Sequence, residues 1–477
     1  MKEVPENNQY TLPGLEPCEK AHKTVSRTGE MNYISRAGVL PLKDASGETE
    51  AEIFFTSYDL KDAGDRSKRP LTFVFNGGPG SSSIWLHMGA LGPRRVVMEP
   101  EGWLPSPPYR LEDNAYTWLD ETDLVFIDPV ETGYSRAVSD KVIDKYWGYT
   151  GDLESVGEFI RLYLSRYCRW DSPVYLAGES YGTTRAAGLA GHLQEVHGIA
   201  PAGIVLISTA LSLRPIFFAG GDDLPFSLFL PTYAAAARYH NKLSDDLQAL
   251  PLVQLHKEVS EWAETDLVTA LMKGDRLSAD KRSEIIYTLN RYTGLSKEYI
   301  AGTDLRINIL RFCKELLRDS GRTIGRLDAR FKGIDGDNTG EMPENDPSMS
   351  AIKYPYSAVF NQYAVSELGV KTDLRYRLMH HFENRKWKWE NGQLPDTGDI
   401  LRGAMSRNRW MKVLVAQGYY DLATPSFATE YMISHMRLDS EIRQNLSLKF
   451  YEAGHMFYLE KNSLREFRKD VSEMYSL

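Results

Sequence analysis

A serine flanked by glycines is the residue best placed in this chain to act as a nucleophile. Ser180 lies in the run Gly-Glu-Ser-Tyr-Gly at residues 178–182, after the apolar residues 174–177 and before a helix-like stretch of small residues. Gly-x-Ser-x-Gly between a strand and a helix is typical of a nucleophile elbow, a sharp turn that exposes the serine hydroxyl. The glycines leave room for neighbouring backbone to pass close to the turn. Because so short a pattern recurs by chance, its partners must be sought elsewhere in the chain.

An acid and a histidine follow the last two strand-like runs. Residues 412–416 lead into a loop that contains Asp421, and residues 448–450 lead into a loop that contains His455. Nucleophile, acid and histidine occur in this chain order, each after a strand, in α/β-hydrolases. We expect His455 to accept the proton of Ser180 and return it to the leaving group, and Asp421 to orient His455. A helix cap or turn for Asp421, and a structural loop role for His455, are the alternatives that the shared strand context disfavours.

A glycine-rich loop could supply the hydrogen bonds that this chemistry needs. The loop Asn-Gly-Gly-Pro-Gly at residues 76–80 follows the strand-like run 71–75. A tetrahedral intermediate requires two preset N–H donors, one of which comes from the residue after the nucleophile, Tyr181. The glycine loop is placed to supply the other. Phosphate binding is less favoured, because the loop lacks the lysine of a P-loop and the spacing of a dinucleotide fingerprint.

The order of strand-like and helix-like runs predicts an α/β fold with a mostly parallel central sheet flanked by helices. Continuous apolar runs suit strands that are covered on both faces. These runs lie at residues 71–75, 123–128, 174–177, 203–208, 412–416 and 448–450. Residues 31–60 predict antiparallel strands joined by a turn, and residues 151–167 have helical spacing.

Changes in the pattern of apolar and polar residues divide the chain into four parts. We predict an N-terminal arm at 1–27, the first part of an α/β-hydrolase core at 28–211, a mainly helical inserted cap at 212–395, and the second part of the core at 396–477. Inside the cap, the pairs His380-His381 and Trp387-Trp389 could line a substrate groove or could pack the cap.

One cap segment imitates part of a calcium loop. Residues 333–340 read Gly-Ile-Asp-Gly-Asp-Asn-Thr-Gly, and Asp346 stands at the twelfth loop position. Thr339 occupies the third ligand position, and Pro343 argues against the helix that should follow. We prefer a polar turn, and we predict neither a metal nor a cofactor.

Composition limits the partners and the compartment. The 477 residues carry a net charge of −9, which argues against nucleic acid or an anionic membrane surface as the main partner. The first thirty residues contain no apolar export segment, and no uncharged stretch reaches about 18 residues. The odd, scattered cysteines Cys18, Cys168 and Cys313 argue against a disulfide framework. A reducing cytoplasm is the expectation, although a periplasmic or secreted protein without its signal peptide would look the same, and the oligomeric state is not indicated.

Taken together, the glycine loop at 76–82, the elbow at 178–182, the Asp421 loop and Ala-Gly-His-Met at 453–456 resemble the serine carboxypeptidase family. The resemblance is to peptidases of the S10 or carboxypeptidase C/cathepsin A type, and particularly to a bacterial branch without disulfides. It implies an α/β-hydrolase fold with an inserted cap, and removal of C-terminal residues from a peptide substrate. It also implies a triad of Ser180, Asp421 and His455, with the N–H groups of Gly78 and Tyr181 as the oxyanion hole.

The resemblance further implies a site for the terminal carboxylate of the substrate, formed by Asn76, Gly77 and Glu179. A buried glutamate that faces a carboxylate should have a raised pKa, since two like charges cannot both stay ionised in a dry pocket. The second glutamate of the family aligns with Ala90, so Arg94 or His87 could supply compensating charge.

Other functions remain open at this stage. The chain could instead be an esterase, amidase or acyltransferase that uses the same triad, because fold and triad do not determine the acceptor. A binding protein with vestigial hydrolase machinery is a third reading.

Overall fold

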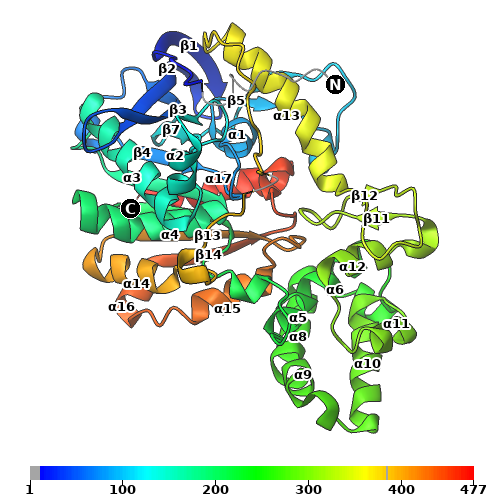
Figure 1. The fold of residues 1–477 in the computed structure, drawn as a ribbon. Coiled ribbons are helices and arrows are strands. Elements are labelled where there is room, and N and C mark those ends of the chain that lie inside the picture. Colours follow the sequence, from blue (N-terminus) through cyan, green and yellow to red (C-terminus); the bar gives the residue numbers. More distant parts are fainter. Residues whose placement is uncertain (1–10, 383–384, 477) are drawn as a thin grey trace, which may run out of the picture.

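A ten-stranded sheet forms the centre of the computed structural model, which describes residues 11–382 and 385–476 (Figure 1). The strand order is β1-β2-β3-β7-β4-β9-β10-β13-β14, and β8 pairs with β3. The strands are β1 Cys18–Ser26, β2 Gly29–Lys43, β3 Thr49–Leu60, β4 Leu71–Phe75, β7 Asp123–Ile127, β8 Arg136–Ala137, β9 Val174–Ser180, β10 Gly203–Thr209, β13 Lys412–Gly418 and β14 Leu446–Tyr451. Pairs from β1 to β7 are antiparallel, whereas all pairs from β7 to β14 are parallel. The predicted mostly parallel α/β sheet is confirmed.

The central parallel strands are largely apolar because both faces of the sheet are covered. Every residue of β4, β7 and β10 is buried. On β4, Phe73 points into one hydrophobic cluster, together with α3 (Tyr149–Arg166) and α4 (Tyr181–His192). Its neighbour Val74 points into a second cluster, on the opposite face, with α13 (Pro347–Ser366) and α17 (Lys461–Tyr475). Successive residues of one strand therefore pack against two helical layers.

The N-terminal region differs from the predicted arm at 1–27. Residues Cys18–Ser26 form β1, an edge strand that pairs with β2 from Cys18–Ala37 to Ser26–Gly29. The buried residues of β1 are Thr24 and Ser26, both polar. No apolar alternation therefore marks this strand in the sequence. The first ten residues of the predicted arm lie outside the described residues.

A helical lobe stands away from the sheet, drawn in green in Figure 1. Its helices are α5 Leu224–Leu228, α6 Leu230–Tyr239, α7 Asp245–Gln248, α8 Leu252–Trp262, α9 Val268–Lys273, α10 Ala279–Thr293, α11 Lys297–Gly302 and α12 Ile309–Glu315. The lobe lies within the predicted cap of residues 212–395. The later part of that range does not belong to the lobe, since α13 returns to the main body. There the hydroxyl of Tyr363 is hydrogen-bonded to the hydroxyl of Tyr58 on β3 at 2.9 Å. The insertion thus comprises a protruding lobe and a helix that packs against the sheet layer.

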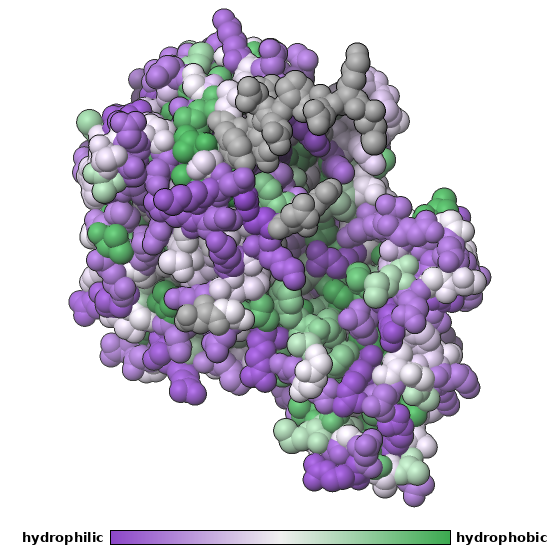
Figure 2. All heavy atoms as spheres, in the orientation of Figure 1, coloured by the Kyte–Doolittle hydropathy of each residue, from purple (hydrophilic) through white to green (hydrophobic). Residues whose placement is uncertain are grey.

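The surface in Figure 2 is mostly hydrophilic, with hydrophobic residues gathered where the lobe meets the main body. Across residues 11–382 and 385–476, no helix has both the length and the apolar character needed to cross a membrane.

Candidate active site

Ser180 sits on a strained turn between β9 and α4. Its backbone angles are φ 60° and ψ −129°, a conformation that costs a non-glycine residue about 1–3 kcal/mol. The strand, turn and helix that the sequence predicts around Ser180 are all present. Gly182 admits no side chain, because a Cβ there would lie 2.8 Å from the carbonyl oxygen of Phe75. The backbone of the elbow can therefore pack directly against the end of β4, which is followed by the glycine loop.

His455 and Asp421 lie on adjacent loops after β14 and β13, and their side chains are in direct contact. Nδ1 of His455 is 2.7 Å from Oδ2 of Asp421, and Asp421 is fully buried. The N–H of His455 donates to the carbonyl of Leu327 at 2.6 Å, and the hydroxyl of Ser208 donates to the carbonyl of His455 at 2.5 Å. Bonds on both sides of its backbone thus hold the histidine in place.

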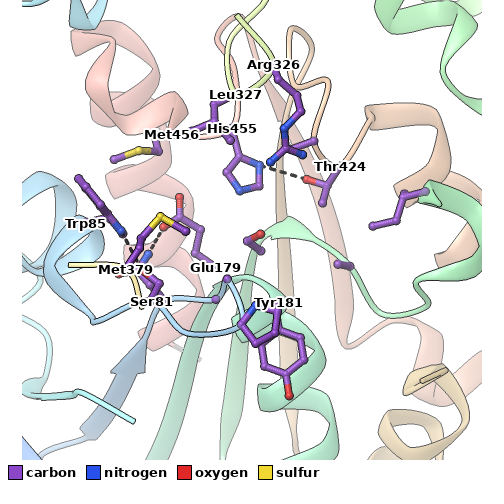
Figure 3. A pocket seen from close by; sticks show the side chains of 18 of the residues that line it. Ser81, Trp85, Glu179, Tyr181, Arg326, Leu327, Met379, Thr424, His455 and Met456 are labelled. Carbon is purple, nitrogen blue, oxygen red and sulfur yellow. Dashed lines mark hydrogen bonds between the residues drawn. The ribbon is translucent and has the colours of Figure 1, made fainter. Parts of the chain in front are cut away.

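Further donors hold the carboxylate of Asp421. Oδ1 accepts the N–H groups of Ala423 and Thr424, at 2.7 and 2.9 Å. Oδ2 accepts the Thr424 hydroxyl at 2.6 Å and the Gln417 amide at 3.2 Å. The Thr424 hydroxyl also lies 3.3 Å from Nδ1 of His455 (Figure 3). Burial alone lowers the pKa of His455, but the charge and hydrogen bond of Asp421 outweigh burial and raise it.

The glycine loop and the first turn of α4 meet beside Ser180. A Cβ on Gly77 would lie 2.5 Å from the backbone nitrogen of Tyr181. Gly78 has φ 104°, and Gly78, Ser180 and Tyr181 line the same pocket. As the first residue of α4, Tyr181 has an N–H without an intrahelical acceptor, at the positive end of the helix dipole. This arrangement can stabilise a negative oxygen.

A buried arginine ties the two segments together, which the sequence did not reveal. Arg185 of α4 donates from Nη1 to the carbonyl of Asn76 at 2.7 Å and from Nε to Asp152 at 2.7 Å. Tyr181 also donates its hydroxyl to Asp152, at 3.0 Å. The sequence around Asp152 and around Arg185 shows only helical spacing. Their contact in the structure is therefore what identifies them as residues that support the site.

Glu179 points into the pocket from the residue before the nucleophile, and only 2% of it is exposed. Asn76 donates its amide to Oε2 of Glu179, and the hydroxyl of Tyr458 lies 3.0 Å from both carboxylate oxygens. Burial raises the pKa of Glu179 to about 7, and the charge of His455 and the hydrogen bonds from Tyr458 and Asn76 only partly oppose that rise. Tyr458 lies three residues after His455, and the sequence alone did not identify it as a site residue.

The three residues discussed around the missing second glutamate do not line the pocket. Ala90 is fully buried, and its carbonyl accepts the amide of Asn114 at 2.7 Å. His87 is buried against Tyr58, and burial lowers its pKa to about 3, so it is uncharged. Arg94 is engaged with Asp113 and with Glu367, so the compensation expected from Arg94 or His87 is wrong.

Part of the returning insertion lies against the glycine loop. Met379 forms an isolated β-bridge with Ser81, and both side chains face the pocket in Figure 3. Of the two tryptophans considered as groove residues, Trp389 lines the pocket, whereas Trp387 packs its ring 5.4 Å from that of Tyr181. His380 packs against Trp147 and Phe382 instead.

The calcium-like segment holds an internal cation. Lys314 places its ammonium 2.6 Å from Oδ2 of Asp335, and Glu344 accepts the N–H groups of Gly336 and Asp337. Within the described parts of the chain, no group of three or more His, Cys, Asp or Glu side chains could hold a metal ion.

Known proteins resemble this chain over about a third of its length in sequence and over most of its length in fold. The family model described as serine carboxypeptidase matches residues 27–197. The pheromone-processing carboxypeptidase KEX1 of Saccharomyces cerevisiae is 31% identical over 188 residues, which is 36% of this chain and 24% of that protein. Serine carboxypeptidase-like 11 of Arabidopsis thaliana is 31% identical over 156 residues, which is 30% of this chain and 34% of that protein. The matches therefore span only about a quarter to a third of these relatives.

The crystal structure of the prohormone-processing carboxypeptidase KEX1 from S. cerevisiae superposes with a TM-score of 0.56 at 16% identity, covering 93% of this chain and 91% of that one. At this identity the likeness establishes the α/β-hydrolase fold alone. These relatives are fungal and plant proteins and do not bear out a bacterial branch without disulfides, although Cys18, Cys168 and Cys313 are free in the structure. The resemblance to the serine carboxypeptidases is nevertheless confirmed, since residues 27–197, which carry the glycine loop and the nucleophile elbow, match the model of that family.

Proposed function

We propose that this chain is a serine-type carboxypeptidase that removes C-terminal residues from peptides through an acyl-enzyme on Ser180. The observation that carries the proposal is the 2.7 Å contact between buried Asp421 and His455, in a pocket that also presents Ser180 and the protonatable Glu179. Ser180, His455 and Asp421 suit acyl transfer. Glu179 adds a group that can recognise a free carboxyl end.

The chemistry follows from these positions. His455 accepts the proton of the Ser180 hydroxyl as the oxygen attacks the last peptide carbonyl, and Asp421 stabilises the imidazolium that forms. The N–H groups of Gly78 and Tyr181 stabilise the oxyanion. His455 then gives the proton to the departing amino group, the terminal amino acid leaves, and water repeats the sequence to release the shortened peptide.

Glu179, Asn76 and Gly77 bind the terminal carboxylate of the substrate in this proposal. With its pKa raised to about 7, Glu179 is protonated in mildly acidic solution and can donate a hydrogen bond to the substrate carboxylate. The hydroxyl of Tyr458 orients the carboxyl group of Glu179. In this proposal Glu179 binds the substrate carboxylate without the second glutamate of the family.

Three substrates test the proposal. A peptide with a free C-terminus, the same peptide amidated, and a simple aryl ester are offered to the purified protein and to Ser180→Ala. We expect stepwise release of C-terminal residues from the free peptide, slow turnover of the amidated one, and no activity in the variant. Ester turnover without peptide cleavage would make the chain an esterase or acyltransferase, and failure of an organophosphate to label Ser180 would leave a binding protein.

We further propose a peptide substrate as the partner, with neither nucleic acid nor a membrane surface involved. The compartment also stays a proposal: the cytoplasm, with the periplasm or secretion as the alternative.

A further inference from the structure

One arginine in the pocket has no assigned task. Arg326 follows the short strand β11 (Thr323–Ile324), which comes after the helical lobe, and is half-buried with its side chain beside His455 (Figure 3). Among the described residues that line the pocket, the carboxylate, imidazole and guanidinium side chains belong to Glu179, His455 and Arg326. A guanidinium keeps its charge at every working pH.

The acidic groups nearest in the chain already have other partners. Asp328 forms an ion pair with Arg330 at 2.7 Å and accepts the N–H of Gly454 at 3.0 Å. Asp346 caps the start of α13, since it accepts the N–H and hydroxyl of Ser348, and it accepts the backbone N–H of Arg326. Within the described residues no ion pair or hydrogen bond is formed by the guanidinium of Arg326. A half-buried cation of this kind is available to a ligand.

Its position separates it from the proposed carboxylate site. In Figure 3, Glu179 and Met379 lie on one side of the His455 ring, and Arg326 and Thr424 lie on the other. The backbone of Leu327, next to Arg326, holds the N–H of His455. If the terminal residue of the substrate occupies the Glu179 side, the acyl part of the peptide extends past His455 toward Arg326.

We propose that Arg326 selects substrates with an acidic side chain, Asp or Glu, in the acyl part of the peptide, upstream of the bond that is cleaved. This inference rests on the proposed carboxypeptidase function and deepens it. Planar bidentate hydrogen bonding matches a guanidinium to a carboxylate, and the partly buried setting weakens competition from water. Hydrogen bonds to charged groups contribute about 1.5–3 kcal/mol, which corresponds to roughly a tenfold to hundredfold preference.

A set of nearly isosteric peptides tests the inference. N-blocked tetrapeptides with Glu, Gln or Lys, placed either at the penultimate position or one residue further upstream, are compared at pH 6 by kcat/KM. We expect the wild-type protein to prefer Glu over Gln by about tenfold or more at one of these positions. Arg326→Met should bring the ratio to about one, Arg326→Lys should retain part of it, and Arg326→Glu should favour Lys. The ratio between peptides is the readout, because the charge of Arg326 also lowers the pKa of His455 and so affects absolute rates.

Arg322→Met is the matched control, since Arg322 is an exposed arginine of the same segment and does not line the pocket. It should leave the Glu/Gln ratio as in the wild type. Hydrolysis of the Gln peptide with a ratio that Arg326→Met does not change would overturn this inference alone. The inference would also be overturned if Arg326→Met lost discrimination between free and amidated C-termini, because Arg326 would then hold the terminal carboxylate. If no peptide is cleaved at all, the carboxypeptidase proposal falls, and this inference with it.

Discussion

The hydroxyl of Tyr458 lies 3.0 Å from each carboxylate oxygen of Glu179, and both side chains are buried beside the nucleophile. The hydrogen bond stabilises the ionised form of Glu179, while burial, the larger effect, favours the protonated form. Tyr458 therefore holds the pKa of Glu179 below the value that burial alone would give.

Tyr458→Phe should raise the pKa of Glu179 above about 7, because it removes a donor to the charged carboxylate. The free-carboxylate peptide should then keep a low KM to higher pH than in the wild type. KM measured from pH 5 to 9 checks this, with the amidated peptide as the control that should not respond. A KM profile that moves to lower pH would contradict the assigned role of Tyr458. Thermal unfolding should show a loss of about 0.5–1.5 kcal/mol.

Glu179→Gln should remove the pH dependence of binding, since a side-chain amide donates a hydrogen bond at every pH. In the wild type, Glu179 is protonated below pH 7 and ionised above it, so KM for the free peptide should rise above that pH, by up to about tenfold per unit. In the variant KM should stay level between pH 5 and 9. An equally steep rise in the variant would show that another group controls carboxylate binding.

Asp421→Asn should lower kcat by about 10⁴-fold, because the amide favours the wrong tautomer of His455 and no longer stabilises the imidazolium. Without the charge of Asp421, burial would outweigh the smaller opposing effect of Glu179 on His455, so its pKa should fall and the acid limb of the kcat profile should shift to lower pH. Steady-state rates with the best peptide measure both effects. Circular dichroism should show a folded variant, and a loss of less than tenfold would argue that Asp421 only shapes its loop.

Gly77→Ala should disturb the oxyanion site, since the added Cβ would lie 2.5 Å from the backbone nitrogen of Tyr181, which cannot move aside. We expect kcat to fall about 10²–10³-fold, as expected when one donor to the oxyanion is lost. Gly220→Ala is the control, because a Cβ there meets no atom within 4 Å. Equal behaviour of the two variants would mean that the loop does not need its close approach to α4.

The sequence predicts the parts of this fold that depend on local pattern. Strands such as β4 and β13 are recognisable because burial on both faces makes them continuously apolar, and the loops that follow them carry Asn76 and Asp421. The edge strand β1 is hidden, because its buried residues Thr24 and Ser26 are polar.

Contacts between distant segments could not be predicted in the same way. Tyr458 meets Glu179 across 279 positions, and Arg185 bonds to Asn76 across 109. Tyr458 lies in a short helical turn and Arg185 in α4, and neither is unusual in its own element. Only the three-dimensional path of the chain gives each of them a partner, and the same holds for Arg326, which follows the lobe but lies in the pocket.

The return of α13 to the sheet layer bears on how this protein could be re-engineered. Arg326 precedes α13, whereas Met349 and Ile352, which also line the pocket, lie on a helix that is bonded to β3 through Tyr363 and Tyr58. A graft that exchanges the segment before α13 would replace Arg326 and leave the Tyr363–Tyr58 bond intact. A graft that includes α13 would also have to rebuild one hydrophobic layer of the scaffold. A segment grafted to change the proposed specificity should therefore end before α13 begins.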